Sequence, residues 1–126
     1  MLNCLYVLAG GGLGSLARYL STQFINSSAA AKFPFGTLFV NCLGALIIGF
    51  LINIFDVFSL KIGWKLFLIT GFLGGYTTFS TYSLETAQFF MSGNIKYAVI
   101  NILSNNVLCI LFVLLGIWLN KSIFAK

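Results

Sequence analysis

Histidine is absent from this sequence of 126 residues, and acidic residues are nearly absent, with only Asp56 and Glu85 present. Without histidine, the chain cannot build a serine–histidine triad or a histidine-ligated metal centre. The two acids stand far apart in the sequence, which disfavours a two-carboxylate hydrolase site. No nucleophile–base pair or metal-ligand cluster is evident, so the sequence predicts that this protein is not an enzyme.

Charge of either sign is also scarce. Charged residues make up 7% of the chain and hydrophobic residues 60%. Ordinary soluble domains are ~25% charged, and a domain of this size has too little interior to hide so much apolar surface. The mean hydropathy of +1.02 agrees. We therefore expect an all-α protein that crosses the lipid bilayer several times.

Cysteine is limited to Cys4, Cys42 and Cys109, which all fall in apolar stretches. They match neither a metal-binding Cys-x-x-Cys pattern nor a disulfide framework, so we expect them to pack between helices. The seven basic residues are scattered along the chain, and they are Arg18, Lys32, Lys61, Lys65, Lys96, Lys121 and Lys126. No run of them indicates a nucleic-acid footprint, so no nucleic-acid partner is expected.

Four apolar stretches are long enough for a helix to cross the hydrocarbon core, which takes ~20 residues. They run over approximately residues 2–24, 35–55, 65–91 and 97–120. The connections are short, so residues 1–126 are expected to form a single four-helix transmembrane domain. Small residues at four-residue spacing predict close helix contacts at Gly10/Gly14, Ala45/Gly49 and Gly71/Gly75. Four short helices enclose little of a pathway, so we also expect an oligomer.

The connections carry nearly balanced positive charge. Four spans place both termini on one side, together with four lysines, and leave two lysines on the other side, or three basic residues if Arg18 reaches it. The positive-inside rule normally gives a larger difference. The pattern therefore allows either a weak preference for termini inside or insertion in both orientations.

The third span contains the most polar tract. Three glycines, Gly71, Gly74 and Gly75, precede five hydroxyl side chains, which are those of Thr77, Thr78, Ser80, Thr81 and Ser83. This density indicates a surface that faces a partner helix or water. Paired glycines are a poor helix interior, and a break at Gly74–Gly75 would free backbone carbonyls that can hold a small cation. The alternative is a continuous helix that packs tightly at glycine.

Other polar and aromatic residues of the spans could act on an ion. Phe79 and Tyr82 share a helix face and present ring edges of positive potential, although ordinary aromatic packing is the more common explanation of such a pair. Asn41 supplies two amide donors.

Arg18 is either a functional residue inside the membrane or a residue whose side chain extends to the lipid headgroups. Glu85 is either a coupling acid of a proton-driven exporter or an acid in a vestibule. The fourth span adds amides and a hydroxyl at Asn101, Ser104, Asn105 and Asn106, of which Asn101 and Asn105 share a face.

Three sequence blocks carry a resemblance to a known family. They are Gly-Gly-Leu-Gly-Ser-Leu-Ala-Arg-Tyr at 11–19, Gly-Thr-Leu-Phe-Val-Asn at 36–41, and Gly-Gly-Tyr-Thr-Thr-Phe-Ser-Thr-Tyr-Ser-Leu-Glu at 74–85. In order, spacing and length the chain resembles the bacterial fluoride channels, often called Fluc, over essentially its whole length. The third block is the most specific of the three.

The resemblance implies a fluoride-selective channel that exports the fluoride ion passively across the bacterial inner or plasma membrane and so lowers cytoplasmic fluoride toxicity. Members are antiparallel, dual-topology homodimers with two pores, and their third helix is broken, here near Gly74–Thr78. A structural sodium ion (Na⁺) lies at the dimer centre. By motif position, the main-chain carbonyls of Gly74 and Thr77 would hold it.

The resemblance also assigns a fluoride pathway, which comprises Asn41, Phe79, Tyr82, Ser80, Thr81 and Thr37. Arg18 and Glu85 would lie in a vestibule, and Asn105 matches a polar position of the fourth helix more loosely. Tyr82 stands where the family usually has phenylalanine, so its site could hold fluoride at the ring edge or through the hydroxyl. Hydroxyls, an amide and ring edges in a narrow passage can replace the water of fluoride and exclude the larger chloride.

Two other functions fit parts of the sequence. A small dual-topology, proton-coupled multidrug exporter would use Glu85 as its membrane-embedded acid, and proton dependence of transport would distinguish it from a channel. A non-transporting assembly subunit would explain the small-residue contacts but not the polar third span.

Overall fold

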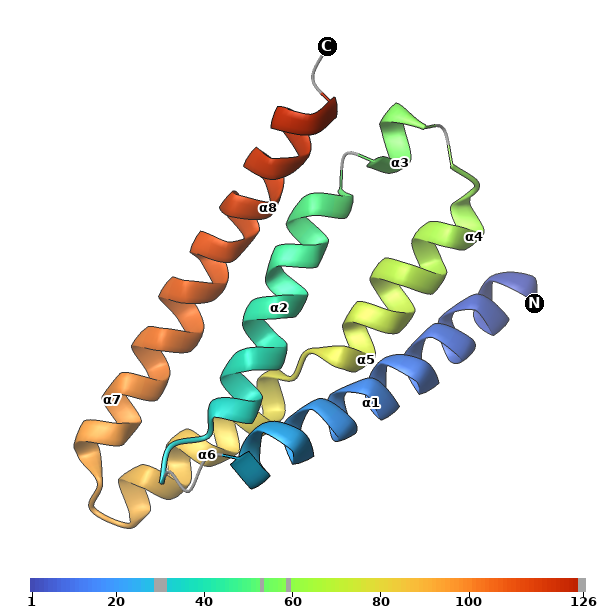
Figure 1. Ribbon diagram of the computed structural model, residues 1–126. Helices are drawn as coiled ribbons and strands as arrows, with labels where there is room; N and C mark the ends of the chain where they lie inside the picture. The colour runs from blue at the N-terminus through green and yellow to red at the C-terminus, as the bar shows by residue number, and fades with distance from the viewer. Residues whose placement is uncertain (29–31, 53, 59, 125–126) are drawn as a thin grey trace.

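The computed structural model describes residues 1–28, 32–52, 54–58 and 60–124, which form helices joined by short connections (Figure 1). The helices are α1 (Leu2–Ser28), α2 (Phe35–Leu51), α3 (Ile54–Val57), α4 (Ile62–Lys65), the π-helix η1 (Leu66–Leu73), α5 (Gly74–Tyr76), α6 (Phe79–Met91), α7 (Ile95–Leu103), the π-helix η2 (Ser104–Leu108) and α8 (Cys109–Phe124). Helices α4, η1 and α5 are continuous with one another, as are α7, η2 and α8. For the described residues the all-α fold is therefore confirmed, with four long helical stretches: α1, α2, a third stretch from α4 to α6 and a fourth from α7 to α8. The short α3 lies between the second and third stretches.

The helix ends differ from the limits of the apolar stretches. Helix α1 continues past residue 24 to Ser28, and the fourth stretch spans Ile95–Phe124. Apolar composition marks only the part of a helix that avoids water, whereas backbone hydrogen bonds continue into polar residues. Helix α2 ends early, at Leu51. Asn53, which was expected in the second span, and Lys126 lie outside the described residues.

Within the described residues, one helix is long and apolar enough to cross a membrane. It is Ile95–Phe124, with 30 residues. Helix α2 is apolar but has only 17 residues. The third stretch is interrupted at residues 77–78, so neither of its pieces has the length of a full span.

Helix α1 lies beside the third stretch and runs in the same direction (Figure 1). Glycine makes this contact possible, because a Cβ at Gly10 or Gly14 would clash with the carbonyl oxygens of Phe67 and Phe72. A Cβ at Gly75 would likewise meet the α1 backbone at 2.5 Å. The close contacts predicted for these small residues are confirmed.

Helix α2 lies beside η2 and α8, also in parallel (Figure 1). A Cβ at Gly49 would clash with the carbonyl of Val113, and a Cβ at Gly116 would clash with the α2 backbone. About two turns before these glycines, the Sγ atoms of Cys42 and Cys109 lie 3.9 Å apart. Cys42 and Cys109 therefore pack between helices, as their apolar setting predicts, whereas Cys4 is exposed on α1, so the prediction is wrong for that residue.

A short turn joins α6 to α7. Gly93 has a φ of +75° there, a conformation that glycine adopts without steric cost. Figure 1 places this turn at the opposite end of the molecule from α3 and the two termini. The four helical stretches therefore run alternately in the two directions, as four spans require.

Candidate functional site

The third helical stretch breaks at Thr77 and Thr78, inside the segment where the sequence predicts a break. Both residues adopt extended backbone conformations, with φ/ψ of −83°/160° at Thr77 and −149°/113° at Thr78. Gly74 and Gly75 remain helical, so the glycine pair is not itself the break. Gly75 instead serves the close contact with α1, where a Cβ would lie 2.5 Å from the Gly11 carbonyl oxygen.

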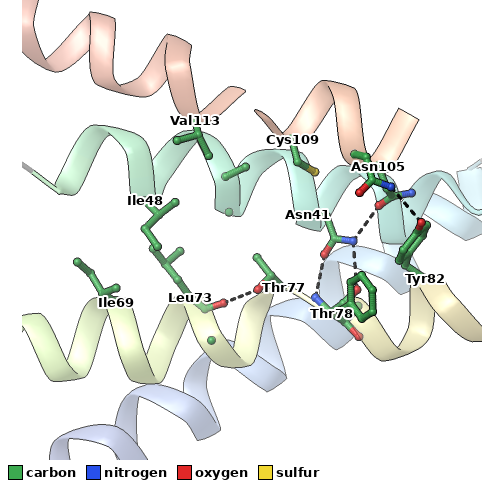
Figure 2. A pocket seen from close by; sticks show the side chains of 15 residues that line it. Asn41, Ile48, Ile69, Leu73, Thr77, Thr78, Tyr82, Asn105, Cys109 and Val113 are labelled. Atoms are coloured by element: carbon green, nitrogen blue, oxygen red, sulfur yellow. Dashed lines mark hydrogen bonds between the residues drawn. The ribbon is translucent and has the colours of Figure 1, made fainter. Parts of the chain in front are cut away.

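Asn41 of α2 holds the broken segment in place (Figure 2). Its Oδ1 accepts a hydrogen bond from the Thr78 amide at 2.8 Å, and its Nδ2 donates to the Thr78 carbonyl at 3.1 Å. The same nitrogen donates to Oδ1 of Asn105 at 2.9 Å. The side chain of Asn41 thus satisfies backbone groups that the break would otherwise leave unpaired. Its donation to an anion stays a prediction.

The contact with Asn105 begins a chain of buried hydrogen bonds. Asn105 donates to Oδ1 of Asn101 at 2.9 Å, and Asn101 donates to Oγ1 of Thr86 at 2.9 Å. Thr86 in turn donates to the Tyr82 carbonyl at 2.8 Å. Asn101 is fully buried. The common face predicted for Asn101 and Asn105 is confirmed, and this network fixes the fourth helical stretch against α2 and α6.

Thr78 also caps the N-terminus of α6. Its Oγ1 accepts a hydrogen bond from the Thr81 amide at 3.1 Å and donates to the Thr81 hydroxyl at 2.9 Å. The Ser80 hydroxyl lies 3.3 Å from the same oxygen. The positive end of the α6 dipole and three hydroxyls meet here, which is a favourable setting for an anion. Thr78 is not among the site residues predicted from the sequence, although a threonine directly before a helix is a capping signal.

A cavity of about 410 Å³ lies between α2, the broken third stretch and the fourth stretch (Figure 2). It brings together six of the residues assigned from the sequence, which are Asn41, Gly74, Thr77, Phe79, Tyr82 and Asn105. The rings of Phe79 and Tyr82 lie 5.3 Å apart between centroids, with their planes at 62°. No charged side chain is among the described residues that line the cavity. Neutral donors and ring edges therefore face the same space.

The Tyr82 hydroxyl has a partner that the sequence analysis did not assign to the site. Nδ2 of Asn106 donates to this hydroxyl at 3.1 Å, and Asn106 also lines the cavity. The replacement of phenylalanine by tyrosine at a buried position is the signal that could have found it, because a buried hydroxyl needs a polar neighbour.

Arg18 approaches the break from α1. Its Nη1 donates to the Thr77 carbonyl at 3.1 Å, and the residue is partly buried. Arg18 lines neither the cavity at the helix break nor a second cavity beside the α6–α7 turn. Its vestibule role stays a prediction, and in the structure its visible role is to stabilise the broken backbone.

Thr37 and Glu85 meet away from the first cavity. The Thr37 hydroxyl donates to Oε1 of Glu85 at 2.6 Å. Glu85 lines a second cavity of about 720 Å³ beside the α6–α7 turn, together with Lys32, Gln88 and Asn94 among others. Oε2 of Glu85 is buried and makes no hydrogen bond to the described residues. The seven pathway residues assigned from the sequence, counting Asn105, therefore fall into three groups. Thr37 lies with Glu85, and Ser80 and Thr81 lie at the cap of α6. The other four line the first cavity, and they are Asn41, Phe79, Tyr82 and Asn105.

Comparison with known proteins gives consistent results over nearly the whole chain. A family profile described as "CrcB-like protein, Camphor Resistance (CrcB)" matches residues 5–117. A protein of Campylobacter fetus subsp. fetus (strain 82-40), named fluoride-specific ion channel FluC, is 42% identical over 121 residues, which cover 95% of this chain and 94% of that protein. The FluC of Hydrogenobaculum sp. (strain Y04AAS1) is 47% identical over 116 residues, covering 91% of this chain and 94% of the relative. The FluC of Parabacteroides distasonis is 37% identical over 125 residues, covering 99% and 98%. This chain therefore belongs to the CrcB-like family, as its three sequence blocks indicate.

Proposed function

We propose that this chain is a fluoride-selective channel that passes fluoride passively out of the cell and so lowers its toxicity in the cytoplasm. The observation that carries this proposal is the cavity at the helix break, which gathers Asn41, Phe79, Tyr82 and Asn105 without a charged side chain. Relatives of matching length that bear the name fluoride-specific ion channel support it. They give no support to the proton-coupled exporter.

A location in the lipid bilayer, with several spans in the bacterial inner or plasma membrane, agrees with the surface of the molecule. Few hydrophobic side chains are buried, whereas many large ones are exposed along α1 and α8, including Leu5, Leu8, Leu13, Leu16, Ile110, Leu111, Leu114 and Trp118. Continuous apolar surface of this kind is rare on a soluble monomer. A lipid or protein environment would cover it.

The cavity suits the requirements for selecting fluoride. Fluoride is small and strongly hydrated, so a pathway must replace its water with close donors and positive ring edges. Both amide hydrogens of Asn41 already bond acceptors, at the Thr78 carbonyl and Asn105. A fluoride ion that enters beside Asn41 therefore takes the place of one of these acceptors. Each amide hydrogen of Asn41 then still has a hydrogen-bond acceptor.

A second copy of the chain, inserted in the opposite orientation, would complete the site. Phe79 is 76% exposed although it belongs to a cavity wall, and Gly74 beside it is also exposed. An antiparallel homodimer would cover these residues and create two pores. The nearly equal positive charge of the two ends supports insertion in both orientations.

A structural sodium ion at the dimer centre fits the backbone of the break. In a continuous helix the Thr78 amide would donate to the Gly74 carbonyl, but here it donates to Asn41. The Gly74 carbonyl is thus released from its helical partner, and carbonyl oxygens are suitable ligands for a hard cation. The Thr77 carbonyl accepts from Arg18 and has a second lone pair. The main-chain carbonyl oxygens of Gly74 and Thr77 from each copy would coordinate the ion. The ion would thereby link the broken third stretches of the two copies.

Passive efflux from liposomes tests the proposed function. Purified protein is reconstituted without a proton gradient, and release is followed with a fluoride electrode and, separately, a chloride electrode. We expect rapid fluoride release and negligible chloride release, with protein-free liposomes as the control. Absence of fluoride release from folded, reconstituted protein would contradict the channel, and proton-coupled export of a cationic drug through Glu85 would then be tested.

A further inference from the structure

The Tyr82 side chain is held at both ends. Its backbone belongs to α6, and its hydroxyl accepts a hydrogen bond from Nδ2 of Asn106 on η2 at 3.1 Å. The same nitrogen of Asn106 donates to the Ile102 carbonyl at 2.7 Å. Since an amide nitrogen carries two hydrogens, both are used, and the Asn106 amide cannot rotate without losing one of the bonds.

The bond to Asn106 also sets which part of Tyr82 faces the cavity. Tyr82 is only 8% exposed, and its ring meets Phe79 in a tilted arrangement with centroids 5.3 Å apart. The hydroxyl oxygen accepts from Asn106 with one lone pair, and this bond fixes the direction of the phenol relative to η2. The ring edge, whose hydrogens carry positive potential, remains beside Phe79.

We propose that Asn106 is a positioning residue of the ion pathway, which holds the Tyr82 phenol so that its ring edge, and not its hydroxyl, faces the permeating fluoride. This inference rests on the proposed function. It explains how tyrosine can stand in a position where a phenylalanine ring edge is expected: the additional hydroxyl is bonded to Asn106.

The proposal makes Asn106 necessary only while position 82 carries a hydroxyl. If Asn106 is removed, the buried phenol loses its donor and the ring turns to find another partner, because an unpaired buried hydroxyl is unfavourable. If the hydroxyl is absent, nothing remains for Asn106 to hold. The effects of changing the two residues should therefore depend on each other.

Four proteins in the liposome efflux assay measure this dependence: the unaltered chain, Tyr82→Phe, Asn106→Leu and the double variant. Leucine has the same branched arrangement of side-chain heavy atoms as asparagine but cannot donate. We expect Asn106→Leu to reduce fluoride flux about fivefold in the unaltered chain, as the loss of one hydrogen bond predicts, and less than twofold in the Y82F background. Asn3→Leu, an exposed amide of α1 outside both cavities, is the matched control and should leave flux unchanged.

Three results would overturn the proposal. Flux could be unaffected by Asn106→Leu, reduced equally in both backgrounds, or abolished by Tyr82→Phe alone, which would mean that the hydroxyl itself contacts the ion. If Asn106→Leu does not fold, Asn106→Ser replaces it in both backgrounds, because the shorter hydroxyl cannot reach Tyr82. Absence of fluoride release from the unaltered chain would overturn the proposed function as well, whereas normal release without dependence between the residues would overturn this inference alone.

Discussion

At the scale of single residues, Asn41 connects the helix break with the rest of the site. It forms three hydrogen bonds, to the amide and carbonyl of Thr78 and to Asn105. An amide side chain can accept from one backbone group and donate to the other at once. The sequence indicated Asn41 from its motif, but its role at the break depends on Thr78, which lies 37 positions away.

Asn41→Asp should suppress fluoride flux at least tenfold. The carboxylate keeps the acceptor for the Thr78 amide but loses both donors and places a negative charge on the anion path. Efflux from liposomes with equal amounts of reconstituted protein measures the effect. Asn3→Asp adds the same charge outside the two cavities and controls for the change in net charge. Normal flux in Asn41→Asp would show that Asn41 does not line the pathway.

Phe79→Ala should also weaken conduction, by several-fold. The variant removes a ring edge from the cavity wall while changing little of the fold, since Phe79 is 76% exposed. The appropriate comparison is Phe90→Ala on the same helix, because Phe90 is 49% exposed and lies outside both cavities. Equal flux in the two variants would remove the argument that the Phe79 ring assists the ion.

At the scale of helices, the sequence predicted what depends on local pattern. The apolar runs located four helical stretches, and small residues at four-residue spacing located the close contacts of α1 and α2. The position of the break was predicted only to within a few residues, because it is decided by contacts from other helices. Gly75 stays helical against α1, and Thr78 is drawn out of the helix by Asn41. The pairing of Asn106 with Tyr82 is likewise a tertiary contact that spacing alone does not reveal.

The close contact between α1 and the third stretch predicts opposite effects for two neighbouring glycines. A Cβ at Gly14 would clash with the Phe72 carbonyl, whereas a Cβ at Gly12 has open space around it. Gly14→Ala should therefore lower the free energy of unfolding by ~1–3 kcal/mol, through forced separation of the helices. Gly12→Ala should be neutral or stabilising, because alanine is the better helix former. Thermal unfolding in detergent compares the two variants. Equal midpoint temperatures would show that the contact between Gly14 and the Phe72 carbonyl leaves room for a Cβ.

At the scale of the whole molecule, the charges at its two ends bear on how it inserts. Among the described residues, Lys61, Lys65 and Lys121 lie near the end with α3 and the termini, and Lys32 and Lys96 lie near the opposite end. Arg18 contributes to neither end, because it bonds the Thr77 carbonyl at the break. With Lys126, which the sequence adds at the C-terminus, the balance is four lysines against two, a difference too small to fix one orientation by the positive-inside rule.

Dual topology therefore predicts that each end of the chain is found on both sides of the membrane. Single cysteines at two exposed serines test this, Ser92→Cys in the α6–α7 turn and Ser122→Cys near the end of α8, in a background where Cys4, Cys42 and Cys109 are replaced by alanine. A membrane-impermeant maleimide added to intact cells should label roughly half of each variant, and permeabilisation should raise both to completion. The two variants control for each other, since a chain with one orientation would expose one cysteine fully and hide the other. That all-or-none result would contradict the antiparallel homodimer, and a pathway completed by a second copy would then require two copies in the same orientation.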